Sequence, residues 1–151
     1  MNYTDTLINQ YTDLSVQTAM KTHFCELGLN ITTWAGLFQE MEQDGANFTF
    51  IRKNETGNVT GFIQFTTMNL ESWFFSAKCG FIREFWIRAD LRRQGHGSKL
   101  LRPAEEWLRQ QGCLCILLTT STAPEFYCKH GYDLQKSICA RNQEPVYLKH
   151  L

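Results

Sequence analysis

A glycine-rich turn between a strand-like and a helix-like segment is the feature that most constrains this chain. The strand-like segment covers residues 80–88, and the turn reads Arg92-Arg93-Gln94-Gly95-His96-Gly97-Ser98. Two glycines at alternate positions let the backbone approach a ligand closely, and the following helix directs its unpaired N–H groups and positive dipole end there. Such a turn binds phosphate, and flanking arginines add charge-assisted hydrogen bonds. A plain connecting turn can carry the same glycines, so the rest of the sequence is needed to distinguish a phosphate site from a connection.

Length and charge narrow the class of protein. A chain of 151 residues with 43 % hydrophobic and 13 % aromatic side chains predicts a single domain, residues 1–151, with an ample core. A net charge of zero argues against a general nucleic-acid binder. Residues 1–50 hold one basic and six acidic side chains, whereas residues 81–110 hold seven basic and four acidic ones. The basic excess therefore surrounds the glycine turn, although two ordinary solvated faces would show the same charges.

Nothing in the sequence indicates export or a membrane span. The N-terminus lacks the charged-then-apolar pattern of a targeting peptide, and no apolar run approaches the ~18 residues that a span needs. The six cysteines are scattered, so we expect reduced thiols that pack as small hydrophobes in a cytoplasmic protein. No Cys/His grouping has zinc spacing, and we expect no metal.

The hydrophobic periodicity predicts ten elements in the order helix, helix, strand, strand, strand, helix, strand, helix, strand, strand. Their expected ranges are residues 5–27 (one helix, or two with a new start at Thr12-Asp13), 33–44, 47–53, 59–68, 80–88, 92–111, 113–118, 123–130, 132–141 and 146–150. The strand–helix–strand unit around the turn implies a right-handed crossover with parallel pairing. Trp73-Phe74-Phe75, in the expected loop 69–79, either folds onto the core or forms a contact surface.

Two separate motifs resemble the GNAT superfamily of N-acetyltransferases. Arg92, Gly95 and Gly97 match its Arg/Gln-x-x-Gly-x-Gly/Ala loop, and residues 123–132 resemble its Phe-Tyr-x-Lys-x-Gly-Phe/Tyr signature. The resemblance implies an α/β (α+β) fold: a mixed, mostly antiparallel twisted sheet with a central parallel β-α-β crossover, splayed to hold coenzyme A, and two N-terminal helices. The element order matches from about residue 47, whereas the family's usual first strand is not evident.

The resemblance also implies the cofactor and the way it binds. Residues 47–151 would form the acyl-CoA-binding core and residues 1–46 a helical acceptor-side segment. The turn would hold the pyrophosphate of acetyl-CoA, the co-substrate, and the pantetheine arm would pair with the strand before it. The expected cofactor-binding residues are Phe85, Trp86, Ile87, Arg92, Arg93, Gln94, Gly95, His96, Gly97, Ser98, Thr119 and Phe126. We expect His96, which lies between the glycines, to face solvent or phosphate.

Transfer of an acetyl group to an amine by direct attack needs a base for the amine and an acid for the departing thiolate. By resemblance Tyr127 is the general acid; the alternative is a tyrosine that packs its helix onto the sheet. Glu84 is the candidate base, and the alternative is a cross-strand partner of Arg83 or Arg52. Glu26 and Glu40 are further candidates. The family often has an asparagine before the short helix, and Thr119, Thr120 and Ser121 occupy that region here.

The acceptor is an amine on a small molecule, a protein or a peptide, and the acidic balance of residues 1–50 favours a cationic one. Trp34 and Phe38 either line an aromatic acceptor pocket or belong to the core. A homodimer is an open alternative, and neither a membrane nor a nucleic acid is expected as a partner. Two rival functions are a non-catalytic acyl-CoA-binding sensor or interaction module and an enzyme that acetylates aminoacyl-tRNA. The acidic N-terminal residues argue against the second.

Overall fold

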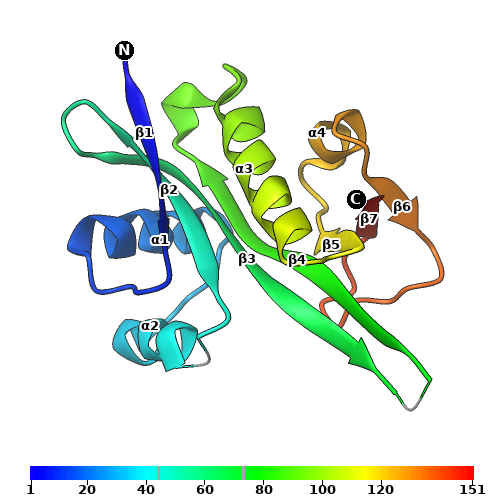
Figure 1. Ribbon diagram of the computed structural model, residues 1–151. Coiled ribbons are helices and arrows are strands. Elements are labelled where there is room, and N and C mark those ends of the chain that lie inside the picture. Colours follow the sequence, from blue (N-terminus) through cyan, green and yellow to red (C-terminus); the bar gives the residue numbers. More distant parts are fainter. Residues whose placement is uncertain (44, 73) are drawn as a thin grey trace. The chain divides into compact units, whose positions relative to one another are not determined.

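The computed structural model describes residues 1–43, 45–72 and 74–151 (Figure 1). These residues form one mixed seven-stranded sheet in the order β1-β2-β3-β4-β5-β7-β6. The elements are β1 (Tyr3–Ile8), α1 (Leu14–Glu26), α2 (Trp34–Gln43), β2 (Phe48–Asn54), β3 (Val59–Glu71), β4 (Ser76–Ile87), the 3-10 helix η1 (Ala89–Leu91), α3 (His96–Gln110), β5 (Cys115–Thr119), α4 (Pro124–Lys129), β6 (Asp133–Gln135) and β7 (Val146–His150).

The chain divides into two compact units. The first unit contains residues 1–65 and 84–104, and the second contains residues 66–83 and 105–151. Strands β3 and β4 and helix α3 each contribute residues to both units. No helix in the described part of the chain combines the length and hydrophobicity that a membrane crossing requires.

The first unit begins with a strand that the sequence analysis did not predict. β1 runs antiparallel to β2, with Tyr3 opposite Asn54 and Ile8 opposite Thr49. The expected helix over residues 5–27 is therefore wrong for residues 5–13, because residues 5–8 pair with β2 and residues 9–13 form the irregular connection to α1. The alternative start at Thr12-Asp13 is confirmed: Asp13 Oδ1 accepts from Ser15 N at 2.8 Å and caps α1.

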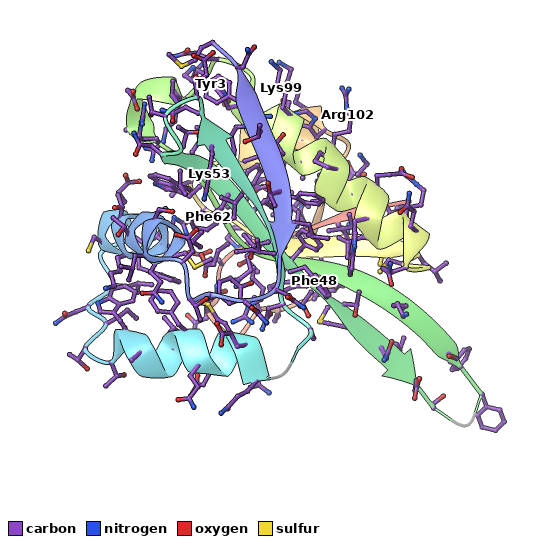
Figure 2. The ribbon with its side chains drawn as sticks, turned by 60° about the vertical axis from the view of Figure 1, so that its left-hand side comes forward. Tyr3, Phe48, Lys53, Phe62, Lys99 and Arg102 are labelled. Carbon is purple, nitrogen blue, oxygen red and sulfur yellow. The ribbon has the colours of Figure 1, made fainter. Side chains whose placement is uncertain are left out.

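The core of the first unit lies between its helices and one face of its strands. Both α1 and α2 lie on the same side of β2 and β3, and Phe62 points toward α1 (Figures 1 and 2). The buried apolar cluster comprises Tyr11, Val16, Ala19, Met20, Phe24, Phe38, Met41, Ile51, Val59, Phe62 and Trp86. Trp34 packs against this cluster and stacks on Phe38, with ring centroids 6.1 Å apart. The two aromatic residues proposed for an acceptor pocket are thus part of the core.

The opposite face of the first unit receives the beginning of α3. A Cβ atom added to Gly61 on β3 would lie 2.7 Å from Ile87 Cδ1 and 3.2 Å from Leu100 Cδ1. Only a glycine allows this close approach. The side chains of Ile51 and Arg52 alternate along β2, so Arg52 points away from the apolar cluster and toward α3.

The second unit confirms the predicted parallel pairing. Strands β4 and β5 run parallel over three residue pairs, from Cys79 with Cys115 to Phe81 with Leu117. The last two expected strands form a hairpin, in which β7 runs antiparallel to β6 as well as to β5. Its first strand is only three residues long, because residues 136–145 form turns and irregular backbone.

Two aromatic residues of the second unit are exposed. Phe74 is 90 % exposed and Phe75 69 % exposed, so neither folds onto the core; Trp73 and Asp44, the last residue of the expected second helix, lie outside the described residues. All six cysteines are unbridged thiols, and the sulfur atoms of Cys79 and Cys115 lie 3.4 Å apart on adjacent strands.

Candidate active site

The turn before α3 has the backbone form of an anion site. Arg93 and Gly95 have φ values of 62° and 87°, so left-handed residues alternate along the turn. Left-handed residues within a turn bring successive N–H groups to one side and create a concavity for anions. Residues 92–95 are exposed, and Lys99 N donates to the Gly95 carbonyl at 3.2 Å where α3 begins. Gly97 and Ser98 lie in the first turn of α3.

Two side chains of the turn bind the protein itself. The Arg92 guanidinium donates from Nε to the Ile87 carbonyl at 2.8 Å and from Nη2 to Glu26 Oε2 at 2.5 Å. Gln94 Nε2 donates to the Asp90 carbonyl at 2.9 Å. Arg92 and Gln94 therefore brace the turn, and the exposed backbone is the part of it that is open to a ligand.

The imidazole of His96 does not face solvent, so that part of our expectation for it is wrong. His96 is 8 % exposed, and its Nδ1 lies 3.0 Å from Arg52 Nη1. The ring also packs edge-on against Tyr3, with centroids 4.6 Å apart. A guanidinium only donates, so Nδ1 accepts and the imidazole is neutral with its hydrogen on Nε2. Burial lowers the pKa of His96, and the positive charges of Arg52 and Lys99 lower it further.

Arg52 is held in place from the other side by β1. Asp5 accepts from Arg52 Nε at 2.7 Å and from Nη2 at 2.6 Å, in a bidentate pair. Tyr3 and Lys99, both labelled in Figure 2, come from β1 and α3 and border this cluster. Strand β1, which the sequence analysis missed, thus supports the residue at which α3 begins.

Side chains that alternate at the end of β4 differ in how deeply they are buried. Trp86 is 5 % exposed and donates from its indole N–H to Glu26 Oε2 at 3.2 Å. Phe85 and Ile87 are half-buried and alternate with it on the strand. Glu26 Oε2 thus accepts from both Trp86 and Arg92. Glu40, the other candidate, lies exposed on α2.

Glu84 has a partner that the sequence analysis did not identify. Its Oε2 lies 2.6 Å from Nε2 of His23 on α1, whereas the alternative interpretation of Glu84 named Arg83 or Arg52 as its partner. The His23 side chain is 9 % exposed and the Glu84 side chain 27 % exposed. His23 follows the apolar positions Val16 and Met20 at helical spacing, and a histidine in such a stripe was the available signal.

Tyr127 is buried in the second unit. It is 7 % exposed, and its ring makes edge-on contacts with Phe126 at 5.1 Å and with Tyr132 at 5.6 Å between centroids. Phe126 is half-buried and lies 4.7 Å from the His130 ring. These contacts fit a packing role, and the role of acid for Tyr127 stays a prediction from the resemblance.

Thr119 ends β5 where the family often has an asparagine. Its Oγ1 accepts from Asn142 Nδ2 at 3.3 Å, so an asparagine amide reaches this strand end from the loop between β6 and β7. Thr120 Oγ1 accepts from Ala123 N at 3.1 Å, just before α4. Among the described residues, no group of three or more His, Cys, Asp or Glu side chains is arranged to hold a metal ion.

A mixed sheet with a parallel β4–β5 pair, and an anion-type turn at the start of the intervening helix, together define the fold of an acyl-CoA-dependent acetyltransferase. Residues 15–132 match the family model described as "Acetyltransferase (GNAT) family". The chain therefore belongs to the GNAT acetyltransferases, which transfer an acyl group from acyl-CoA.

Solved structures with low sequence identity share the fold. A GNAT acetyltransferase from Staphylococcus aureus aligns with a TM-score of 0.72 and 15 % identity, over 98 % of this chain and 99 % of that one. Arabidopsis thaliana NAA60, solved with a bisubstrate analogue, aligns with a TM-score of 0.70 and 11 % identity, over 96 % of this chain and 95 % of that one. N-acetylglutamate synthase from Neisseria gonorrhoeae, solved with coenzyme A and N-acetyl-glutamate, aligns with a TM-score of 0.69 and 14 % identity, over 98 % of this chain and 35 % of that one. A comparison with curated proteins gives no match.

Proposed function

We propose that this protein is an N-acetyltransferase that moves the acetyl group of acetyl-CoA to an amine by direct attack. The observation that supports it most is the exposed turn with left-handed backbone at Arg93 and Gly95, at the N-terminus of α3. Backbone amides of residues 93–98 would bind the pyrophosphate, aided by the helix dipole.

The cofactor arm would continue along β4. Pantetheine amides pair with strand backbone as a peptide does, and we assign this role to Phe85, Trp86 and Ile87. The parallel β4–β5 ladder stops at Phe81 and Leu117, and β4 continues beyond this ladder to Ile87. Thr119 and Phe126 are the remaining proposed cofactor contacts.

The chemistry requires one proton acceptor and one proton donor. Glu84 would take a proton from the acceptor ammonium, directly or through water, and the amine nitrogen would then form the C–N bond. The C–S bond would break, and the departing thiolate would receive a proton from Tyr127. A phenol with an ordinary pKa of about 10 is protonated at neutral pH and can serve as that donor.

The proposed acceptor is a cationic amine. Six acidic and one basic side chain in residues 1–50 would attract such a molecule through long-range electrostatics, and salt would weaken the attraction. Arabidopsis thaliana NAA60 and N-acetylglutamate synthase were solved with a bisubstrate analogue and with N-acetyl-glutamate. Peptide N-termini and amino acids are therefore worth including beside polyamines.

A screen of amine classes with acetyl-CoA, followed by release of free coenzyme A thiol, tests this proposal. We expect one class to give turnover that depends on both acetyl-CoA and amine, together with saturable binding of coenzyme A in calorimetry. Binding without turnover for any amine would instead support the acyl-CoA sensor, for which the packing of Tyr127 among Phe126 and Tyr132 is the favouring observation. Absence of coenzyme A binding would refute both functions.

A further inference from the structure

The side chains of His23 and Glu84 come from positions 61 residues apart and meet at 2.6 Å. Both belong to the first unit, His23 on the buried face of α1 and Glu84 on β4. We infer that His23 is the positioning residue for Glu84, a role that rests on the proposed transfer to an amine. His23 fixes the carboxylate through Oε2 and leaves Oε1 to the acceptor.

The exposures of the two side chains support this division of roles. Glu84 keeps 27 % of its side-chain surface exposed, whereas His23 keeps 9 %. Within the described part of the chain, the hydrogen bonds of this carboxylate involve Oε2 and leave Oε1 without a partner. A proton acceptor needs an oxygen that substrate or water can reach, and Glu84 is the member of the pair that offers one.

The surroundings of His23 make it a rigid support. Its ring lies 5.4 Å from the ring of Phe24 and 5.6 Å from that of Phe62, which it meets edge-on. These aromatic rings pack against the imidazole, and because a carboxylate only accepts, the ring donates to it from Nε2. A buried donor with fixed direction holds the carboxylate more tightly than water would, and a small displacement of a catalytic group costs up to about 100-fold in rate.

His23→Leu and His23→Gln are the variants that test the inference. Leucine removes the donor at similar volume, and we expect kcat to fall about 10- to 100-fold while KM for acetyl-CoA stays within twofold. Glutamine places an amide N–H near the position of Nε2, and we expect it to restore most of the lost kcat. Met20→Ala is the matched control, because it opens the same buried helix face and keeps the His23–Glu84 hydrogen bond, and it should leave kcat within about twofold.

The double variant His23→Leu/Glu84→Gln shows whether His23 acts through Glu84. We expect it to be no slower than Glu84→Gln alone, because the carboxylate that His23 holds is already gone. Unchanged kcat in His23→Leu, or an additive loss in the double variant, would overturn the inference while the turnover of the wild-type protein upholds the proposed function. A wild-type protein that binds acetyl-CoA without turning over any amine would overturn the inference and leave cofactor binding standing.

Discussion

Arg52 Nη1 donates to Nδ1 of His96 across 3.0 Å, and this bond joins β2 to the first residue of α3. Because Asp5 holds the same guanidinium with two further hydrogen bonds, three segments distant in sequence converge on the turn proposed to bind pyrophosphate. The bond requires a neutral imidazole, so the cluster responds to pH.

Stability should decrease as the pH falls below neutral. The pKa of His96 is lowered from 6.5, chiefly by burial and then by the Arg52 charge. Between the lowered pKa and 6.5, His96 is therefore protonated in the unfolded chain and neutral in the folded chain. The contribution is complete above pH 6.5 and declines below it. We expect Tm to fall from pH 7 to pH 5, and to fall less in His96→Asn, whose amide oxygen accepts from Arg52 without titrating.

Titration of Asp13 does not contribute to the change in Tm between pH 7 and pH 5. Hydrogen bonds from Ser15 lower its pKa from 3.8 to about 2, so the stability that it contributes is lost only below pH 3.8. Equal slopes of Tm against pH in the wild-type protein and in His96→Asn would show that His96 is not the group responsible.

Gly95→Glu should abolish binding of coenzyme A. A Cβ at Gly95 meets no heavy atom within 4 Å, so the space is open, and the substitution acts through the positive φ of 87° and through its charge. Gly95→Ala carries the same backbone strain, about 1–2 kcal/mol, without the charge. Calorimetric titration with coenzyme A should show weakened binding for alanine and none for glutamate. Similar affinities for both variants would contradict an anion site.

Tyr127→Phe should lower kcat at least 10-fold and change KM for acetyl-CoA little, because it removes the proposed proton donor and keeps the ring. Tyr132→Phe is the control in the same unit. Tyr132 donates to Glu105 at 3.1 Å, and burial, followed by the Glu105 charge, raises its pKa far above the ordinary value, so it stays protonated. We expect it to lower Tm and to leave kcat within threefold. A pair of unchanged kcat values would remove Tyr127 from the mechanism.

Glu26→Gln and Glu84→Gln should separate the candidate bases. The Glu26 carboxylate accepts from Arg92 and Trp86, and an exposed ion pair of this kind contributes only about 0–1 kcal/mol. We expect Glu26→Gln to keep kcat within threefold, and Glu84→Gln to lower it about 100-fold or more, the usual contribution of a general base. The opposite ranking in steady-state kinetics would assign the base to Glu26.

Tyr11→Phe should destabilise the first unit by about 1–3 kcal/mol, the cost of leaving buried polar groups without partners. The fully buried hydroxyl lies 2.7 Å from Thr49 Oγ1 and accepts from Gln64 Nε2 at 3.2 Å. Denaturant unfolding measures the loss. In a Gln64→Met background, where the amide is already absent, the same substitution should cost less; an equal cost would exclude coupling between the two side chains.

Local signals in the sequence predicted much of this fold. Asp13 caps α1 through a bond to a residue two positions away, and Gly28 and Gly131 end helices in left-handed conformation, as their positions indicated. The glycines of residues 92–98 likewise identified the turn before α3. Such features depend on neighbours along the chain, so a pattern of a few residues is enough to reveal them.

Long-range partners account for what the sequence analysis missed. β1 has few buried side chains, and pairing with β2 and the bond of Asp5 to a residue 47 positions away establish it as a strand. Leu7, Tyr11 and Leu14 have helical spacing, yet they fall in a strand, a connection and a helix. His23 and Asn142 escaped notice for the same reason, since Glu84 and Thr119 are distant in sequence.

Strand β1 also shields the outer edge of β2 from other molecules. Deleting residues 1–9 would make β2 the edge strand in place of β1 and expose its backbone donors and acceptors, and exposed edges can recruit strands from neighbouring copies into aggregates. A chain without these residues should therefore lose solubility on purification, even where α1 and the apolar cluster stay intact. Samples for crystals or assays should keep the first nine residues.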